Sequence, residues 1–202
     1  MPSPRASPGG RGREREETIP RTPRAQRTAL RRRLREIEDE LARAQAEYCA
    51  LAVGEPLPGL HLVIGAAGYR ALLPAAPVHE IVRLVALDPL PDAAPHVAGA
   101  FVFRGRPVLA LDMASALGVS REPPLDAQIL ILQGAPHVGL VVDRVEALVE
   151  SPLLVDEQGV EDGGNGEAWR RSGLTVGLCR IDAGLFPLLG IGPCLRAVGG
   201  VG

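Results

Sequence analysis

The sequence contains no lysine, and all 22 of its basic residues are arginine. This absence excludes P-loop nucleotide hydrolases and Schiff-base enzymes, which need a lysine at the reacting group. Aromatic residues make up only 3% of the chain, so a nucleic-acid-binding face with stacking aromatics is not predicted. Its three cysteines, Cys49, Cys179 and Cys194, have no C-x-x-C spacing, so neither a zinc site nor a disulfide framework is predicted.

Other signals are missing as well. No apolar run reaches the ~18–20 residues of a membrane-spanning helix, and the Pro-, Ser- and Arg-rich start has no apolar signal core. The sequence lacks a G-x-S-x-G elbow. None of the four histidines, His61, His79, His96 and His137, pairs with another at metal-ligand spacing. We therefore predict a cytoplasmic protein that holds no metal or cofactor and does not insert into a membrane.

Composition divides the 202 residues into four segments. Residues 1–21 are rich in Pro, Gly, Ser and charge, which is typical of a disordered tail. A helix is predicted for residues 22–54, with Thr22 as its N-cap, Pro23 at its first position, and Gly54 and Pro56 at its end. A β-rich domain is predicted over residues 59–195, followed by a short tail over residues 196–202.

The predicted helix carries an apolar heptad seam. Its members recur at alternating spacings of four and three residues: Leu30, Leu34, Ile37, Leu41, Ala44, Tyr48 and Leu51. Such a seam indicates a short coiled coil, either with a second copy of the chain or with a partner helix. The alternative is that the helix packs on its own domain.

The rest of the chain reads as short strands separated by turn residues. Two short helices are predicted at residues 113–117 and 185–189, and an exposed acidic loop at residues 156–167. Strands are predicted at residues 60–65, 69–73, 97–103, 108–112, 128–133, 137–143 and 174–181. About nine or ten strands in this length fit two small barrels better than one.

Residues 99–112, GAFVFRGRPVLALD, are the most informative stretch. Two apolar arms flank Arg104-Gly105, and glycine accepts the positive φ of a tight hairpin turn. An arginine cannot be buried without a partner, so the turn is predicted to present a charged tip, which suits protein recognition. The alternative is that Arg104 holds two barrels together through Asp112 or Asp143.

Four blocks, taken in order, resemble the CheW family of chemotaxis coupling proteins. They are Val78-His79-Glu80-Ile81-Val82-Arg83, Pro89-Leu90-Pro91-Asp92 running on to Gly99, Arg104-Gly105 running on to Asp112, and Val138-Gly139-Leu140-Val141-Val142-Asp143-Arg144-Val145. The resemblance covers roughly residues 59–195. The chain departs from the family at Val102-Phe103, where members commonly carry Asn-Leu, and at Leu109, where they usually carry proline.

The resemblance implies a mostly β fold of two SH3-like five-stranded barrels that share a hydrophobic junction, preceded here by an α-helix. It implies a non-enzymatic adaptor that couples the cytoplasmic tip of methyl-accepting chemoreceptors to the regulatory domain of a CheA-type histidine kinase, recruited to membrane-associated receptor arrays. It places Val78, Glu80 and Ile81 in the first barrel and the Gly139 block in the second. The partner-binding residues it implies are Val78, Glu80, Ile81, Gly99, Arg104, Gly105, Gly139, Val142, Asp143 and Val145.

The residues themselves allow other interpretations. Glu80 is predicted to lie on the exposed face of an edge strand, Asp143 to cap a strand end, and Trp169 to cover the core of the second barrel. One alternative function is a divergent scaffold of a non-flagellar chemosensory system whose N-terminal helix selects the partner. Another, from a different class, is an enzyme or small-molecule-binding module with a pocket between the barrels, which requires converging polar groups.

Overall fold

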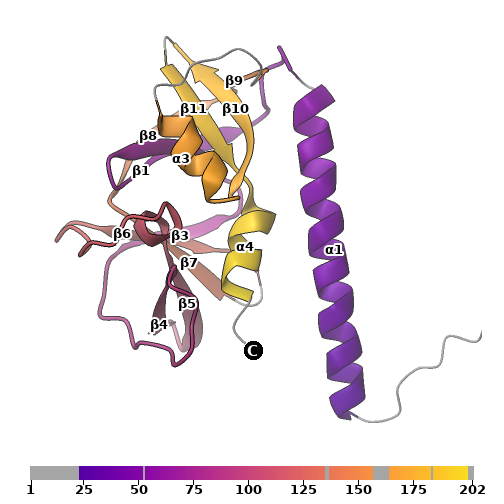
Figure 1. Ribbon diagram of the computed structural model, residues 1–202, viewed down its shortest axis with the longest axis vertical. Helices are drawn as coiled ribbons and strands as arrows, with labels where there is room; N and C mark the ends of the chain where they lie inside the picture. Colours follow the sequence, from indigo (N-terminus) through magenta and orange to yellow (C-terminus); the bar gives the residue numbers. More distant parts are fainter. Residues whose placement is uncertain (1–22, 52, 135–136, 157–163, 183, 200–202) are drawn as a thin grey trace, which may run out of the picture. The chain divides into compact units, whose positions relative to one another are not determined.

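Strands dominate the computed structural model, which describes residues 23–51, 53–134, 137–156, 164–182 and 184–199 (Figure 1). The predicted tail over residues 1–21 and the predicted N-cap Thr22 lie outside this part of the chain. The described helices are α1 (Pro23–Leu51), α2 (Met113–Ala116), α3 (Asn165–Arg171) and α4 (Ile191–Gly199). The strands are β1 (Leu60–Ala66), β2 (Tyr69–Pro74), β3 (Val78–Arg83), β4 (Val97–Phe103), β5 (Arg106–Asp112), β6 (Gln128–Leu132), β7 (His137–Val142), β8 (Arg144–Glu150), β9 (Leu153–Val155), β10 (Thr175–Ile181) and β11 (Gly184–Leu189).

Helix α1 begins at Pro23, as its proline predicts, because the first turn of a helix needs no backbone N–H from that residue. Its described seam leucines and isoleucine are half to four fifths exposed: Leu30 60%, Leu34 52%, Ile37 52%, Leu41 50% and Leu51 80%. The heptad stripe therefore leaves a large apolar area in contact with water.

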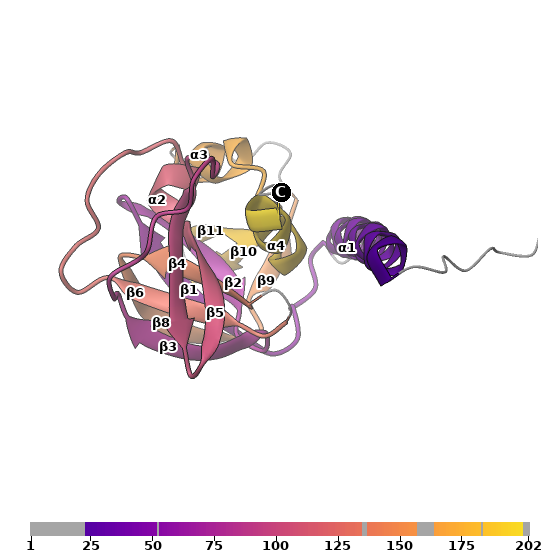
Figure 2. The same cartoon turned by 90° about the horizontal axis from the view of Figure 1, so that it is seen from below.

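The strands form two sheets, which can be followed in Figures 1 and 2. Sheet A has six strands in the order β8-β1-β2-β11-β10-β9, and sheet B has five in the order β3-β6-β7-β5-β4. Most neighbours are antiparallel, but β11 runs parallel to β2, and β5 runs parallel to β7. Sheet A thus joins strands from the two ends of the β-rich region.

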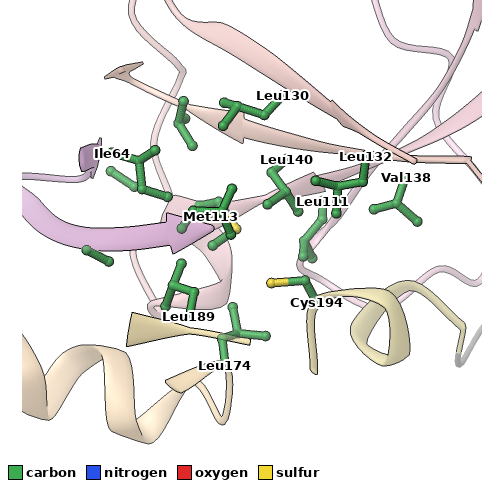
Figure 3. Close-up of a cluster of buried hydrophobic side chains, with 14 of the residues drawn as sticks. Ile64, Leu111, Met113, Leu130, Leu132, Val138, Leu140, Leu174, Leu189 and Cys194 are labelled. Carbon is green, nitrogen blue, oxygen red and sulfur yellow. The ribbon is translucent and has the colours of Figure 1, made fainter. Parts of the chain in front are cut away.

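Strands β6 and β7 are buried on both faces, because each face packs into a different core. Leu130 and Leu132 point into a core shared by the two sheets, whereas Ile129 and Ile131 pack into a core that belongs to sheet B. A third core, around Val63 and Leu72, belongs to sheet A. Figure 3 shows the shared core, to which both sheets and helix α4 contribute side chains.

This arrangement confirms the predicted fold class: a mostly β molecule of two sheets with a hydrophobic junction and an N-terminal helix. Neither sheet forms a closed ring of strand ladders. In sheet B, however, the segment that follows β3 returns to β4, where Asp88 and Ala100 exchange two backbone hydrogen bonds of 2.8 Å. This bridge curls the sheet so that its two outer strands approach one another, in the manner of a small barrel.

Several details differ from the sequence prediction. Sheet A has six strands rather than five, and the Val78 and Gly139 segments lie in the same sheet because β6 pairs with both β3 and β7. Residues 184–189 are strand β11 rather than a helix, since their backbone pairs antiparallel with β10. Helix α4 instead begins at Ile191 and extends past residue 195. Pro193 is compatible with this helix because it lies in the first turn, where a backbone N–H has no acceptor within the helix.

The C-terminal region departs from the prediction in two further places. Residues 165–167 of the predicted acidic loop belong to α3, while residues 157–163 lie outside the described chain. Trp169 on α3 is fully buried in the core shared by the two sheets. It is therefore part of that core rather than a cover over one barrel.

Candidate functional site: the tip of the β4–β5 hairpin

The β4–β5 hairpin turns at Arg104 and Gly105, as the sequence predicts. Phe103 pairs with Arg106 at the ends of the two strands, and the two turn residues have φ values of 48° and 77°. Positive φ at both central residues is the type I′ geometry that matches the twist of a hairpin. Gly105 adopts it freely, whereas Arg104 holds a left-handed backbone conformation that costs an arginine energy.

Arg104 is held at the tip by two contacts within sheet B. Its Nη2 lies 2.7 Å from Oε2 of Glu80 on β3, and its guanidinium carbon lies 5.1 Å from the centre of the Phe103 ring. The arginine side chain is 66% exposed and that of Glu80 33% exposed. The guanidinium is therefore oriented by neighbours while much of it still faces solvent.

Strand β3 is an edge strand, as predicted, but Glu80 does not lie on its more exposed face. The register shifts between Val78 and Glu80, and the outward positions of β3 are His79, Ile81 and Arg83. Ile81 is 39% exposed, and Val102 on β4 is 73% exposed. We refer to Glu80, Val102, Arg104 and Gly105 as the hairpin surface, in which a charged pair accompanies one strongly exposed aliphatic side chain; Ile81 lies on the opposite face of β3 from Glu80.

The two aspartates considered as alternative partners of Arg104 have other roles. Asp112 caps α2, accepting hydrogen bonds from the Ala114 N–H at 3.0 Å and the Ser115 hydroxyl at 2.6 Å. Asp143 forms an ion pair with Arg121, and its Oδ2 accepts a hydrogen bond of 2.9 Å from the Ala67 N–H. Arg104 therefore does not join the two sheets through either aspartate.

Arg121 was not singled out by the sequence, since its surroundings contain no motif. Its ion pair lies at the junction, because Asp143 connects β7 of sheet B to β8 of sheet A and its N–H donates to the Gly65 carbonyl at 2.8 Å. The two side chains are 29% and 21% exposed. This partly buried ion pair is positioned to stabilise the arrangement of the two sheets relative to each other.

The remaining predicted partner-binding residues differ in exposure. Val78 and Val145 are half-buried. Gly99, Gly139 and Val142 are buried, and the first two sit where other atoms approach closely. A Cβ on Gly99 would lie 2.5 Å from the Asp88 carbonyl oxygen, and one on Gly139 would lie 2.6 Å from Cγ2 of Ile129. These residues shape the sheet beneath the hairpin surface, so only the exposed members carry our proposal below.

A cavity of about 380 Å³ opens on sheet A, and its lining is almost entirely apolar. It is lined by Leu57, Pro74, Val176, Leu188 and Ile191, among others, and by His61. Burial lowers the pKa of His61, although a hydrogen bond between its Nδ1 and the Gly59 carbonyl at 3.2 Å acts in the opposite direction. Among the described lining residues, His61 is the one ionisable side chain, so this cavity does not supply the converging polar groups that an enzyme needs.

Two thiols are buried in the described part of the chain, Cys179 and Cys194. Burial raises the pKa of Cys194 to about 12, with a smaller opposing effect of Arg196, so the reactive thiolate is not formed at neutral pH. No three His, Cys, Asp or Glu side chains of the described residues are grouped as metal ligands. Among these residues, no helix is long and apolar enough to cross a membrane.

The fold and the hairpin surface together define a two-sheet β module that presents an oriented charge and an exposed aliphatic side chain at a sheet edge. The family model of the CheW-like domain matches residues 61–193, and the chain belongs to this family. The structure is similar to that of the scaffolding protein TtCheW from Thermoanaerobacter tengcongensis, with a TM-score of 0.53 and 21% sequence identity. This match covers 67% of the present chain and 86% of that chain. The curated proteins gave no match.

Proposed function

We propose that the chain is an adaptor that couples the cytoplasmic tip of chemoreceptors to the regulatory domain of a CheA-type histidine kinase. Membership of the CheW-like family, whose members are non-enzymatic scaffolds of chemotaxis, supports an adaptor. The observation that carries the proposal is the hairpin surface, where Arg104 is oriented by Glu80 and Phe103 yet remains 66% exposed. An adaptor of this kind raises the effective concentration of two partners for one another and needs no catalytic residue.

The chemistry of the hairpin surface suits a protein partner that offers a carboxylate or backbone carbonyl groups beside apolar side chains. Arginine is enriched at the energetic centres of protein interfaces, because its planar fork can donate several hydrogen bonds at once. The ion pair to Glu80 holds that fork in place before binding, so less side-chain entropy is lost on association. Val102 would contribute exposed apolar contact area on the same hairpin.

The direct test is binding of the purified chain to a receptor cytoplasmic tip and to a kinase regulatory domain, measured separately by calorimetry. Arg104→Glu is expected to weaken binding of one partner at least tenfold, which corresponds to about 1.4 kcal/mol. The same charge reversal at exposed Arg180 on β10 serves as the matched control and is expected to leave both affinities unchanged.

Stability measurements separate recognition from a structural role. The Arg104–Glu80 pair is largely exposed, so its loss is expected to cost no more than about 1 kcal/mol of unfolding free energy. The double variant Arg104→Glu with Glu80→Arg can re-form the ion pair with reversed charges, and we expect it to regain thermal stability but not affinity. Recovery of affinity in the double variant, or a large loss of melting temperature in Arg104→Glu, would assign Arg104 to the fold instead.

A further inference from the structure

The apolar seam of α1 lies outside the hairpin surface on which the proposed adaptor function rests. Four of its described aliphatic members, Leu30, Leu34, Ile37 and Leu41, are each at least 50% exposed. In heptad notation, Leu34 and Leu41 occupy a positions, whereas Leu30 and Ile37 occupy d positions. A continuous a/d stripe on a 29-residue helix is the geometry of a two-stranded coiled coil.

The charges on α1 are divided between its two halves. Residues 23–35 contain six arginines and no acidic residue, whereas residues 36–51 contain five acidic residues and one arginine. This order opposes the helix dipole, since the first turn has no acidic residue and the last turn has no basic residue. The charges therefore do not favour an isolated helix, but each half complements the opposite half of a second, antiparallel helix.

We propose that two copies of this chain associate through α1 as an antiparallel coiled coil. In the register where Leu34 faces Ile37 of the partner, Leu30 faces Leu41 of the partner, and twofold symmetry repeats both contacts. Four layers of large aliphatic side chains then lie at the centre of the overlap. The residues that flank this seam have opposite charges, with Arg33 beside Glu40 of the partner and Arg31 beside Glu38 of the partner.

A parallel pair fits the charges less well, because it matches only Arg33 of the flanking charges, with position 38 of the partner, and it gives Arg31 and Glu40 no partner of opposite charge. In contrast, the antiparallel register matches every charged residue that flanks its four central layers with one of opposite sign. A second copy is therefore the occupant that the pattern favours over an unrelated helix, and each dimer would carry two CheW-like domains. This inference does not depend on which receptor or kinase the domain binds.

The test is the mass of the full chain in solution by light scattering, measured over a range of concentrations. We expect twice the 21.3 kDa of one chain. Leu34→Glu, which places a charge in two central layers, is expected to give a monomer with an unchanged melting temperature of the β-rich domain, because Leu34 is exposed in the single chain. A full chain that stays monomeric at every concentration, because α1 folds back or binds another protein, would overturn the proposal.

Charge exchange tests the orientation. Arg33→Glu and Glu40→Arg are each expected to raise the dimer dissociation constant about tenfold or more, since symmetry makes each repulsion occur twice. The double variant restores both pairs only in the antiparallel register and is expected to recover the mass of the dimer. In a parallel pair, position 33 faces position 38 of the partner, so a double variant that stays dissociated would overturn the orientation.

Arg35→Glu provides the matched control, because position 35 lies on the outer face of the helix at a b position. It has the same change of charge as Arg33→Glu and is expected to leave the dimer intact. A dimer that none of the seam or flanking substitutions weakens would place the interface elsewhere and would also overturn the proposal.

Discussion

Individual side chains in this protein separate into those that hold the fold and those that face solvent. Arg104 and Arg121 are both in ion pairs, yet the first is 66% exposed at a hairpin tip and the second is 29% exposed at the junction of the sheets. The energetic consequence differs because exposed pairs are screened by water, whereas partly buried ones keep more of their attraction. Exposure rather than residue type therefore decides which arginine is available to a partner.

His61 is expected to make the folded protein less stable in mild acid. Its pKa is lowered in the folded state by burial, so the unfolded chain, with a histidine pKa near 6.5, takes up the proton first. The stability contributed by neutral His61 is thus present above that value and is lost as the pH falls below it. Thermal unfolding at about pH 7.5 and about pH 5.5 measures the effect.

The variant His61→Gln is expected to lose less stability than the wild type between these two pH values. His79→Gln, at an exposed position on β3, is the control and should retain the drop seen in the wild type. Equal pH dependence in His61→Gln and the wild type would show that His61 does not contribute.

Gly139 is required on β7 because the neighbouring strands leave no room for a side chain. A Cβ there would lie 2.6 Å from Cγ2 of Ile129 on β6 and 3.3 Å from Cγ1 of Val108 on β5. Gly139→Ala is expected to lower the unfolding free energy by about 1–3 kcal/mol through overpacking, as measured by urea denaturation. Gly65→Ala on β1 should cost less, because the nearest atom is Oε1 at the far end of the Glu146 side chain, 3.1 Å away, rather than a packed core atom at 2.6 Å.

At the scale of elements, the turn between β7 and β8 connects the two sheets through Asp143. Asp143→Ala removes the ion pair with Arg121 and leaves the Ala67 N–H without its acceptor. We expect a loss of about 1–3 kcal/mol of unfolding free energy, with little change in partner affinity per folded molecule. Asp126→Ala, an exposed position before β6, is the matched control in the same denaturation experiment. Unchanged stability together with lost affinity would instead place Asp143 in recognition.

The elements with strong local signals could be predicted from the sequence. Strand β4 has the predicted bounds, Val97–Phe103, because its apolar run ends at a turn that glycine marks. Helix α1 begins at the predicted proline. In contrast, the sequence predicts a helix where the structure has β11, since a short apolar run with a proline has no period that separates a helix from a strand. These residues form a strand because they pair with β10 and β2, and the pairing with β2 depends on residues far away in the sequence.

The candidate site was predictable only in part for the same reason. The Arg-Gly turn is a local signal, and the structure has it as a tight hairpin. That Arg104 pairs with Glu80, and that Asp143 pairs with Arg121, depends on how sheet B curls and how the sheets meet. These distances cannot be inferred from the spacing of residues in the sequence, so the sequence does not indicate a role for Arg121.

At the scale of the whole molecule, three cores explain why two sheets behave as one domain. Each sheet has an interior core of its own, and a larger core is shared, with Trp169, Leu189 and Cys194 contributed from the C-terminal region. Because the shared core includes side chains from β1 as well as from α4, loss of either end removes part of it. Substitutions that remove these buried side chains of the C-terminal region should therefore destabilise both sheets together.

The strand order of sheet A also bears on how the polypeptide reaches its native state. Strand β2 gains its second neighbour, β11, only after more than a hundred intervening residues have been made. A pairing between strands so far apart in the sequence forms only after a long loop has closed, and the loss of chain entropy precedes the favourable contacts. Proteins with many such pairings fold slowly, in about milliseconds to seconds. During synthesis on the ribosome, the free edge of β2 must therefore stay unpaired until β11 emerges, and protection by a chaperone at that stage would raise the yield of soluble protein.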